Sequence, residues 1–196
     1  MVEQLTPEEI AALEDTRFLQ LKQQVSEKVI TCFSEIERAL HQQINQQAFR
    51  FPEGTFLKAG KFSKGEQYQN LPYFILDYPR LFTSKEVFAF RTMLWWGHHL
   101  SCTLHLAGPI LQQHQQTLID HIPTDQNLYF CVNESPWEYH YEKDNYLKMS
   151  ELDSIQIETH LNKYGFLKIS DYIPVSHWDQ FKSFTLDAFA RFLRYF

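Results

Sequence analysis

Residues 86–108 read EVFAFRTMLWWGHHLSCTLHLAG, and this stretch decides the fold class that we predict for the chain. It consists of two long apolar segments, rich in aromatic residues, that meet at Trp96 and Gly97. Apolar runs of this length that are broken by a glycine are typical of two strands joined in a hairpin. The hairpin also carries an arginine, a cysteine and three histidines, so it is the first place to look for a functional site.

The register of this hairpin depends on the length of its turn. With a two-residue turn at Trp96 and Gly97, Trp95 is expected to face His98 across the hairpin. A shift by one residue moves the side chains of a strand to the other face, so this register is a hypothesis. With the two-residue turn, Arg91 lies on the same face as Val87, Ala89, Met93, Leu100, Cys102, Leu104 and Leu106. The opposite face then holds Phe88, Phe90, Thr92, Leu94, His99, Ser101, Thr103 and His105.

Helical patterns precede and follow the strands. Thr6, Pro7 and Glu9 form a capping-box sequence that predicts a helix start. Residues 15–47 contain no proline or glycine, and their apolar residues recur at spacings of three and four, as in one long amphipathic helix. We expect this helix to pack on the sheet of the same chain or to reach a second subunit. Its apolar stripe is Phe18, Leu21, Val25, Val29, Phe33, Ile36, Leu40 and Ile44.

The strands come as one run, which favours an α+β domain over a parallel βαβ fold. We predict an antiparallel β-meander of about five or six strands, covered by the long N-terminal helix and by C-terminal helices. Residues 1–196 are expected to form a single domain. Its parts are a helical part at 7–47, the meander at 55–107 and a mixed α/β part at 108–196. Within them we expect an edge strand at 55–63, a short strand at 73–76 and an aromatic surface loop at 133–148.

Composition excludes several classes of partner. The net charge is −6 and no block of lysine and arginine is present, so neither nucleic acid nor an anionic membrane surface is an expected partner. No apolar run approaches the roughly 20 residues that span a bilayer. The polar, acidic N-terminus does not resemble a signal peptide, and the three cysteines suit a reducing compartment. We therefore expect a soluble, cytoplasmic protein.

Arg91 is the most unusual residue, because it stands in the middle of a predicted strand among apolar neighbours. Burying a lone charge is very costly, so Arg91 needs a partner. In one interpretation, Asp77 or Glu86 forms an ion pair with it that holds two strands together. In the other, Arg91 lies at the floor of a pocket for a carboxylate or phosphate, with Arg80 as a second donor.

The histidines do not form a metal-binding pattern. His99 and His105 lie on one face of a strand but about 20 Å apart, at ~3.3 Å per residue, whereas a metal needs three or four converging ligands. The sequence contains no GxSxG, GxGxxG or GxxxxGK[ST] motif. We therefore expect neither a metal nor another cofactor, and the pattern identifies no catalytic residue.

Three functional hypotheses remain. The first is a module that binds a small anionic molecule or a protein, in a pocket between the hairpin and residues 48–72. The second is a hydrolase or transferase for an anionic substrate, in which Arg80 and Arg91 bind the anion and a histidine acts as general base. The third is an assembly module whose long helix forms a homodimer; the oligomeric state, monomer or homodimer, is open. The candidate binding residues are Asp77, Arg80, Arg91, His99 and His105.

Overall fold

The computed structural model describes residues 3–196. Its internal contacts divide the chain into a unit that ends at Glu35 and a unit of residues 36–196, which are described separately. The first unit, here called the arm (residues 3–35), contains α1 (Pro7–Glu14) and the beginning of α2 (Thr16–Gln46). The predicted capping box of α1 is confirmed: the Thr6 hydroxyl accepts from the Glu9 amide at 3.2 Å, and the Glu9 carboxylate accepts from the Thr6 amide at 2.7 Å.

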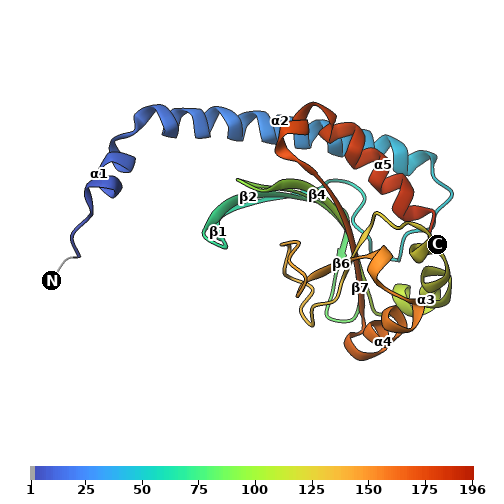
Figure 1. The fold of residues 1–196 in the computed structure, drawn as a ribbon. Helices are drawn as coiled ribbons and strands as arrows, with labels where there is room; N and C mark the ends of the chain where they lie inside the picture. Colours follow the sequence, from blue (N-terminus) through green and yellow to red (C-terminus); the bar gives the residue numbers. More distant parts are fainter. Residues whose placement is uncertain (1–2) are drawn as a thin grey trace. The chain divides into compact units, whose positions relative to one another are not determined.

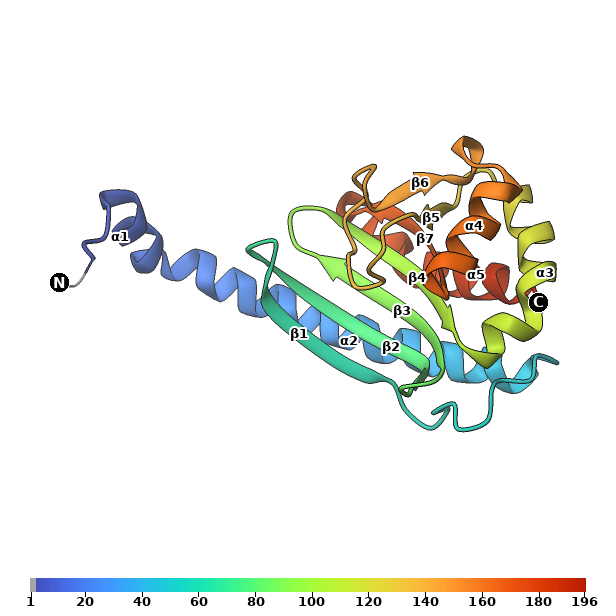
Figure 2. The same ribbon diagram turned by 90° about the horizontal axis from the view of Figure 1, so that it is seen from below.

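The second unit is built on one antiparallel sheet, which confirms the predicted α+β class (Figures 1 and 2). The strand order is β1-β2-β3-β4-β7-β5-β6, so the sheet has seven strands rather than five or six. The first four strands form the predicted meander, and the last three are added at its β4 side. The strands are β1 (Lys61–Tyr68), β2 (Leu71–Phe82), β3 (Val87–Trp95), β4 (His99–Ala107), β5 (Tyr129–Cys131), β6 (Tyr146–Lys148) and β7 (Phe166–Pro174).

Helices cover one face of this sheet (Figure 1). α5 (Phe181–Leu193) packs on its centre, where the Phe189 and Phe90 rings lie 5.0 Å apart. The last turns of α2 run beside α5, and the Gln43 amide donates to the Leu186 carbonyl. Buried side chains of this layer include Ile36, Leu40, Phe88, Leu104 and Phe192. The other helices are α3 (Pro109–His121), α4 (Ser154–Tyr164) and the 3₁₀ helices η1 (Ile122–Thr124), η2 (Met149–Glu151) and η3 (Val175–Gln180).

The predicted hairpin register is wrong by one residue. Trp95 pairs with His99 rather than with His98, because the turn contains three residues, Trp96, Gly97 and His98. The His98 amide donates to the Trp95 carbonyl at 3.1 Å, and Gly97 has a φ of +74°, which glycine adopts without strain. One added residue exchanges the faces of a strand. Arg91 therefore shares its face with His99, Ser101, Thr103 and His105, and not with the leucines of β4.

Two strand boundaries also differ from the prediction. β1 starts at Lys61 rather than at residue 55, and near that position only Phe56 makes an isolated bridge, to Arg80. β2 covers residues 71–82 rather than 73–76, because its pairing with β3 resumes after a break between Asp77 and Arg80. Proline needs no ladder partner at such an irregularity, so Pro79 does not end the strand. A short strand, β6, also occurs within the predicted loop 133–148.

We expect the glycine that precedes α3 to be indispensable for folding. Gly108 has a φ of +76°, and a Cβ there would lie 2.0 Å from the Lys85 carbonyl oxygen. Gly165 has a similar φ of +70° but no atom within 4 Å of such a Cβ, so it is a matched control. Urea unfolding should show a loss of about 1 kcal/mol for Gly165→Ala, from left-handed strain alone. Gly108→Ala should lose clearly more, on the order of 4 kcal/mol. Equal losses would contradict the steric argument.

Candidate functional site

The face of the sheet opposite α5 carries most of the buried polar side chains, and we call it the polar face. The polar residues gather on this face because the three-residue turn makes β3 and β4 direct them to the same side of the sheet. β7 continues the pattern beside β4, with Lys168 opposite His105 and Ser170 opposite Thr103. The buried or half-buried members of the polar face are Asp77, Arg91, His99, Ser101, Thr103, His105, Lys168 and Ser170.

Arg91 is paired with Asp77, as one of the two interpretations of the sequence expected. Two guanidinium nitrogens, Nε and Nη2, donate to the two carboxylate oxygens at 2.7 and 2.8 Å. The side chains are only 15% and 5% exposed, so this is a buried, bidentate ion pair between β2 and β3. The third guanidinium nitrogen donates to the Tyr139 hydroxyl. Glu86, the other expected partner, instead accepts from the Ile110 amide at 2.9 Å.

Lys168 is a second buried cation, which the sequence analysis did not single out. It is fully buried, its ammonium donates to the Glu138 carbonyl, and it lies 4.1 and 4.9 Å from the ring centroids of Tyr139 and Tyr146. Burial lowers the pKa of Lys168 to about 8. The signal in the sequence was a single lysine inside the apolar run of residues 166–169. This pKa lies nearer to neutral pH than those of His99 and His105, which burial lowers to about 4 and 3.

The segment between β5 and β6, residues 132–145, covers the polar face, and we call it the β5–β6 loop (Figure 2). Tyr68 of β1 fastens it: its hydroxyl accepts from the Tyr139 and His140 amides at 2.6 and 3.1 Å and donates to the Glu138 carboxylate. The Tyr141 hydroxyl and the Ser170 Oγ lie 2.5 Å apart. With the bonds from Arg91 and Lys168, the loop is attached to three strands of the sheet.

The two histidines that were candidate ligands are both buried and uncharged at neutral pH. Burial, reinforced by the charges of Lys168 and Arg91, lowers the pKa of His105 to about 3. Burial and the neighbouring His98 lower the pKa of His99 to about 4. A general base works best with a pKa near the operating pH. Neither histidine therefore has the pKa that acid–base chemistry at neutral pH would require.

A pocket of about 340 Å³ opens at one end of the polar face. The β3–β4 turn, the end of β7, the β1–β2 turn and the β5–β6 loop all contribute to it. Three ring nitrogens of its lining residues are buried without a hydrogen-bond partner in residues 3–196: Trp95 Nε1, His99 Nε2 and His140 Nδ1. Trp95 and His99 are 1% and 6% exposed. The lining residues are Gln69, Trp95, Gly97, His98, His99, His140, Tyr141, Glu142, Tyr172 and Pro174.

The structure brings together some of the candidate residues and separates others. Asp77 and Arg91 are in contact, and His105 lies on the same face, close enough for Arg91 to affect its pKa. His99 lines the pocket at the other end of β4. Arg80 lies apart from them, with its guanidinium carbon 4.8 Å from the centroid of the Phe56 ring. The pocket thus includes one of the five candidates, and the sequence analysis missed its loop residues because a loop has no periodicity to read.

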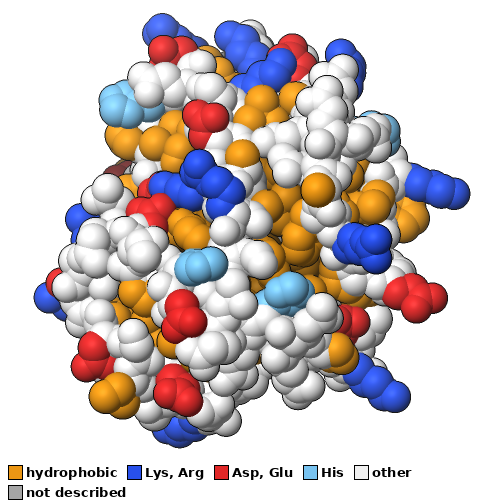
Figure 3. Space-filling view, turned by 90° about the vertical axis from the view of Figure 1, so that its right-hand side faces the viewer, with side chains coloured by type: hydrophobic (Ala, Val, Ile, Leu, Met, Phe, Trp, Pro, Cys, Tyr) orange, Lys and Arg blue, Asp and Glu red, His pale blue; other side chains and the backbone are white. Residues whose placement is uncertain are grey.

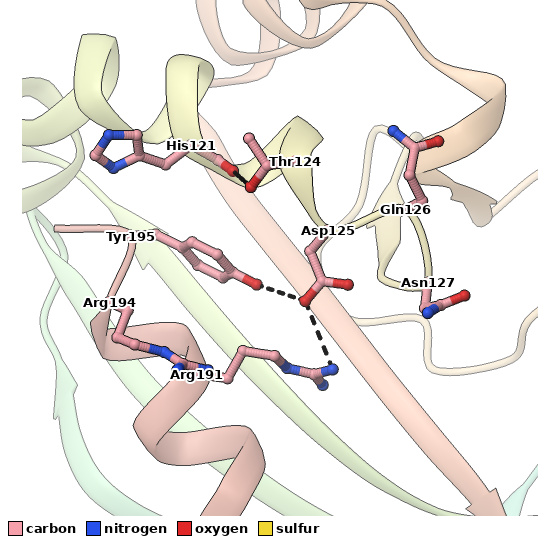
Figure 4. Close-up of a pocket in the computed structure, with 8 residues that line it drawn as sticks. All are labelled: His121, Thr124, Asp125, Gln126, Asn127, Arg191, Arg194 and Tyr195. Carbon is pink, nitrogen blue, oxygen red and sulfur yellow. Dashed lines mark hydrogen bonds and ion pairs between the residues drawn. The ribbon is translucent and has the colours of Figure 1, made fainter.

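A larger hollow, of about 620 Å³, lies between η1 and the C-terminal end of α5 (Figure 4). Its central carboxylate, Asp125, already accepts from the Tyr195 hydroxyl at 2.9 Å and lies 3.6 Å from an Arg191 nitrogen. Arg191 also donates to Asp171 at 2.5 Å. Arg191 Nε is buried without a hydrogen-bond partner in residues 3–196, but the charge of Arg191 is paired with Asp125 and Asp171. The network holds α5, and this hollow is a weaker candidate for ligand binding.

A third hollow, of about 350 Å³, is mainly apolar and lies between α4 and the β5–β6 edge of the sheet. Figure 3 views the side of the molecule that carries α3 and α4 in Figure 1, where hydrophobic side chains gather between scattered charged ones. Ile155 of α4 is 74% exposed and belongs to this groove. The groove offers few polar groups that could orient a small ligand, in contrast to the pocket of His99.

A metal site and a membrane-spanning helix are both absent from residues 3–196, and comparisons with known proteins identify no relative. In residues 3–196, no group of three or more histidine, cysteine, aspartate or glutamate side chains is arranged to hold a metal ion. None of the helices in the same range has both the length and the apolar character that crossing a membrane requires. No protein-family model matches the chain, and no curated protein or solved structure is significantly similar to it. Function must therefore be argued from the geometry of the site.

We predict that the Asp77–Arg91 pair is required as a pair. Asp77→Asn leaves the guanidinium buried without its counter-charge, and removing one partner of such a pair costs about 3–5 kcal/mol. Replacing both residues, as in Asp77→Leu with Arg91→Met, should cost less than the single change, because no unpaired charge remains. Chemical unfolding of the three proteins measures this difference. A single variant as stable as the wild type would contradict the role of the pair.

The buried histidines predict a loss of stability at mildly acidic pH. His99, His105 and His160 have pKa values of about 4, 3 and 4 in the folded chain, mainly because of burial, against an ordinary value of 6.5. Below pH 6.5 these histidines become protonated in the unfolded chain but stay neutral in the folded chain. The free energy of unfolding therefore falls as the pH drops from 6.5 toward 4. His105→Gln should reduce this slope by about 1.4 kcal/mol per pH unit. An unchanged slope in urea unfolding would show that His105 is protonated in the folded chain.

Proposed function

We propose that this protein binds a small molecule carrying one carboxylate, in the pocket of Trp95, His99 and His140. The observation that carries the proposal is that three buried ring nitrogens around one pocket lack a hydrogen-bond partner in the described part of the chain. Buried polar groups are normally satisfied, because leaving one unpaired costs about 1–3 kcal/mol. A ligand in this pocket that accepts hydrogen bonds from these nitrogens, after a small shift of the side chains that bury them, would recover that energy.

The chemistry of the three nitrogens indicates the kind of ligand. An indole N–H can only donate, and a neutral imidazole nitrogen can donate in the appropriate tautomer. The ligand must therefore offer an acceptor to Trp95 Nε1, and an ionised oxygen is the strongest acceptor for such a donor. Glu142 on the rim is exposed and would repel a ligand with several negative charges. These arguments favour a monocarboxylate over a phosphate ester.

The size and walls of the pocket suit a compact ligand with an apolar part. A volume of about 340 Å³ lies at the lower end of the range for small-molecule sites. Aromatic rings form much of its wall: the rings of His99 and Tyr141 meet edge to face at 4.8 Å, and those of Tyr141 and Tyr172 lie 4.5 Å apart. Such a wall supplies apolar contact area for a short chain or a ring that carries the carboxylate.

Binding agrees better with the site than catalysis does. An enzyme that used His99 or His105 as general base would need an imidazole that exchanges protons near neutral pH, but their pKa values are about 4 and 3. The two arginines expected to bind the anion also do not line the pocket: Arg91 is paired with Asp77, and Arg80 lies against Phe56. The features of the site that remain are those of a receptor pocket.

The experiment is a thermal-shift screen with small aliphatic and aromatic monocarboxylic acids, followed by calorimetric titration of the best acid. A bound acid should raise the melting temperature by mass action. Trp95→Phe removes the indole nitrogen, and His99→Phe removes both imidazole nitrogens, including the unpartnered Nε2; each variant keeps an aromatic ring. Each should weaken binding about tenfold, the effect of one lost hydrogen bond of ~1.4 kcal/mol.

Two substitutions of the same chemistry serve as controls. Trp96→Phe and His160→Phe also remove a buried ring nitrogen without a partner, but neither residue lines this pocket. They should leave the affinity unchanged. The uncharged amide of the best acid tests the charge of the ligand and should bind much more weakly. The proposal fails if no acid binds, or if the control variants lose as much affinity as the pocket variants.

A further inference from the structure

The arm exposes an unusual amount of apolar surface. Half of the strongly exposed large hydrophobic side chains of residues 3–196, seven of fourteen, belong to its residues 3–35. Leu13 is 67% exposed, and Phe18 and Leu21 are 53% and 54% exposed. Large exposed apolar patches usually mark an interaction site. The seven side chains are Leu5, Ile10, Leu13, Phe18, Leu19, Leu21 and Ile30.

The first helix of the arm also needs support that its own residues do not provide. α1 has eight residues, and none of them is buried. A helix this short is only marginally stable in water, even with a good cap. The free energy needed to nucleate it exceeds the stabilisation from the hydrogen bonds of two turns. Its capping box and the N-terminal proline favour the helix but do not supply an apolar contact. A partner that packs on Ile10 and Leu13 would supply it.

Charge is divided along the arm in a way that identifies a partner. Residues 3–15 contain five acidic residues and no basic one. Residues 17–28 contain Arg17, Lys22 and Lys28 against a single acidic residue, Glu27. The arm therefore carries an acidic segment at 3–15 followed by a weakly basic one at 17–28; Glu35 lies beyond both. Two such arms are complementary when they run antiparallel, and they repel one another when they run parallel.

We infer that the arm binds a second copy of this chain, as an antiparallel pair related by a two-fold axis near Asp15. In this arrangement α1 of each copy lies along the first turns of α2 of the other. Ile10 and Leu13 then pack on Phe18 and Leu21 of the second copy, in an isologous contact. An anionic lipid surface fits less well, because the acidic half would be repelled from it.

The inferred contact is small, which determines how the dimer should behave. It consists of α1, about 12 Å long at 1.5 Å per residue, and a similar length of α2, taken twice by symmetry. Interfaces below about 1,200 Å² are typical of weak or transient association. The dimer should therefore dissociate on dilution, and the association should not depend on a carboxylate ligand, since the arm contributes no residue to the pocket.

The first test is sedimentation velocity of the full chain over a concentration series. The wild type should move from monomer to dimer, and the paired change Leu13→Asp with Phe18→Asp should stay monomeric. Both side chains are more than half exposed, so the melting temperature should remain within a few degrees of that of the wild type. Ile155→Asp, at a 74% exposed position on α4, is the matched control and should dimerise as the wild type does.

A charge exchange tests the antiparallel arrangement itself. One variant replaces Glu3, Glu8 and Glu14 by lysine; it spares Glu9 and Asp15, whose carboxylates cap α1 and α2. The other replaces Arg17 and Lys28 by glutamate. In each variant alone, two halves of like charge would face one another, so each should be monomeric. A mixture of the two should form a heterodimer, because both facing halves are again of opposite sign.

Several sedimentation results would contradict the antiparallel dimer. A wild type that remains monomeric at every concentration overturns it, including the case in which the monomer instead sediments with anionic vesicles. A trimer or an open series of oligomers overturns the two-fold arrangement. A dimer that survives Leu13→Asp with Phe18→Asp, or charge variants that do not recover on mixing, would place the interface elsewhere in the chain.

Discussion

The buried guanidinium of Arg91 is the group on which the polar side of this molecule depends. A cation away from water is tolerated only where the protein replaces its hydration with acceptors in good geometry. Asp77 provides two of them from the neighbouring strand, and the Tyr139 hydroxyl provides a third from the β5–β6 loop. One side chain therefore connects β2, β3 and a loop that lies 48 residues further along the chain.

Lys168 adds a second constraint on the same loop, by a different kind of contact. Its ammonium is held by the Glu138 carbonyl and by the faces of two tyrosine rings, one of which belongs to Tyr139. The two cations thus act on consecutive residues of the loop. Because this fixes where the following residues, His140 and Tyr141, can lie, the two cations shape the wall of the pocket.

The parts of the fold that could be predicted are those governed by local patterns. The capping box at Thr6 and the long helix predicted over residues 15–47 each depend on contacts within a few residues, and the structure has both. The hairpin register could not be predicted, because a turn of two residues and a turn of three fit the sequence W-W-G-H equally well. That single residue decides whether Arg91 faces leucines or histidines. The pocket could not be predicted from the sequence for a related reason. His140 and Tyr141 belong to a loop whose path is set by contacts with strands that are distant in the sequence.

The chain also separates its charges by region, and this has a consequence for how it could act. Of the net charge of −6, residues 3–15 account for −5, so the remainder of the chain is close to neutral. In the second unit, Asp77 is paired with Arg91, and Asp171 of β7 is paired with Arg191 of α5. In the arm, the exposed acidic residues Glu3, Glu8, Glu9, Glu14 and Asp15 precede the exposed basic residues Arg17 and Lys28. Internal pairing stabilises one chain, whereas segregated blocks on a helix leave electrostatic interactions available between chains. The same composition thus produces a polar face whose ion pairs lie within one chain and an arm whose apolar side chains are exposed.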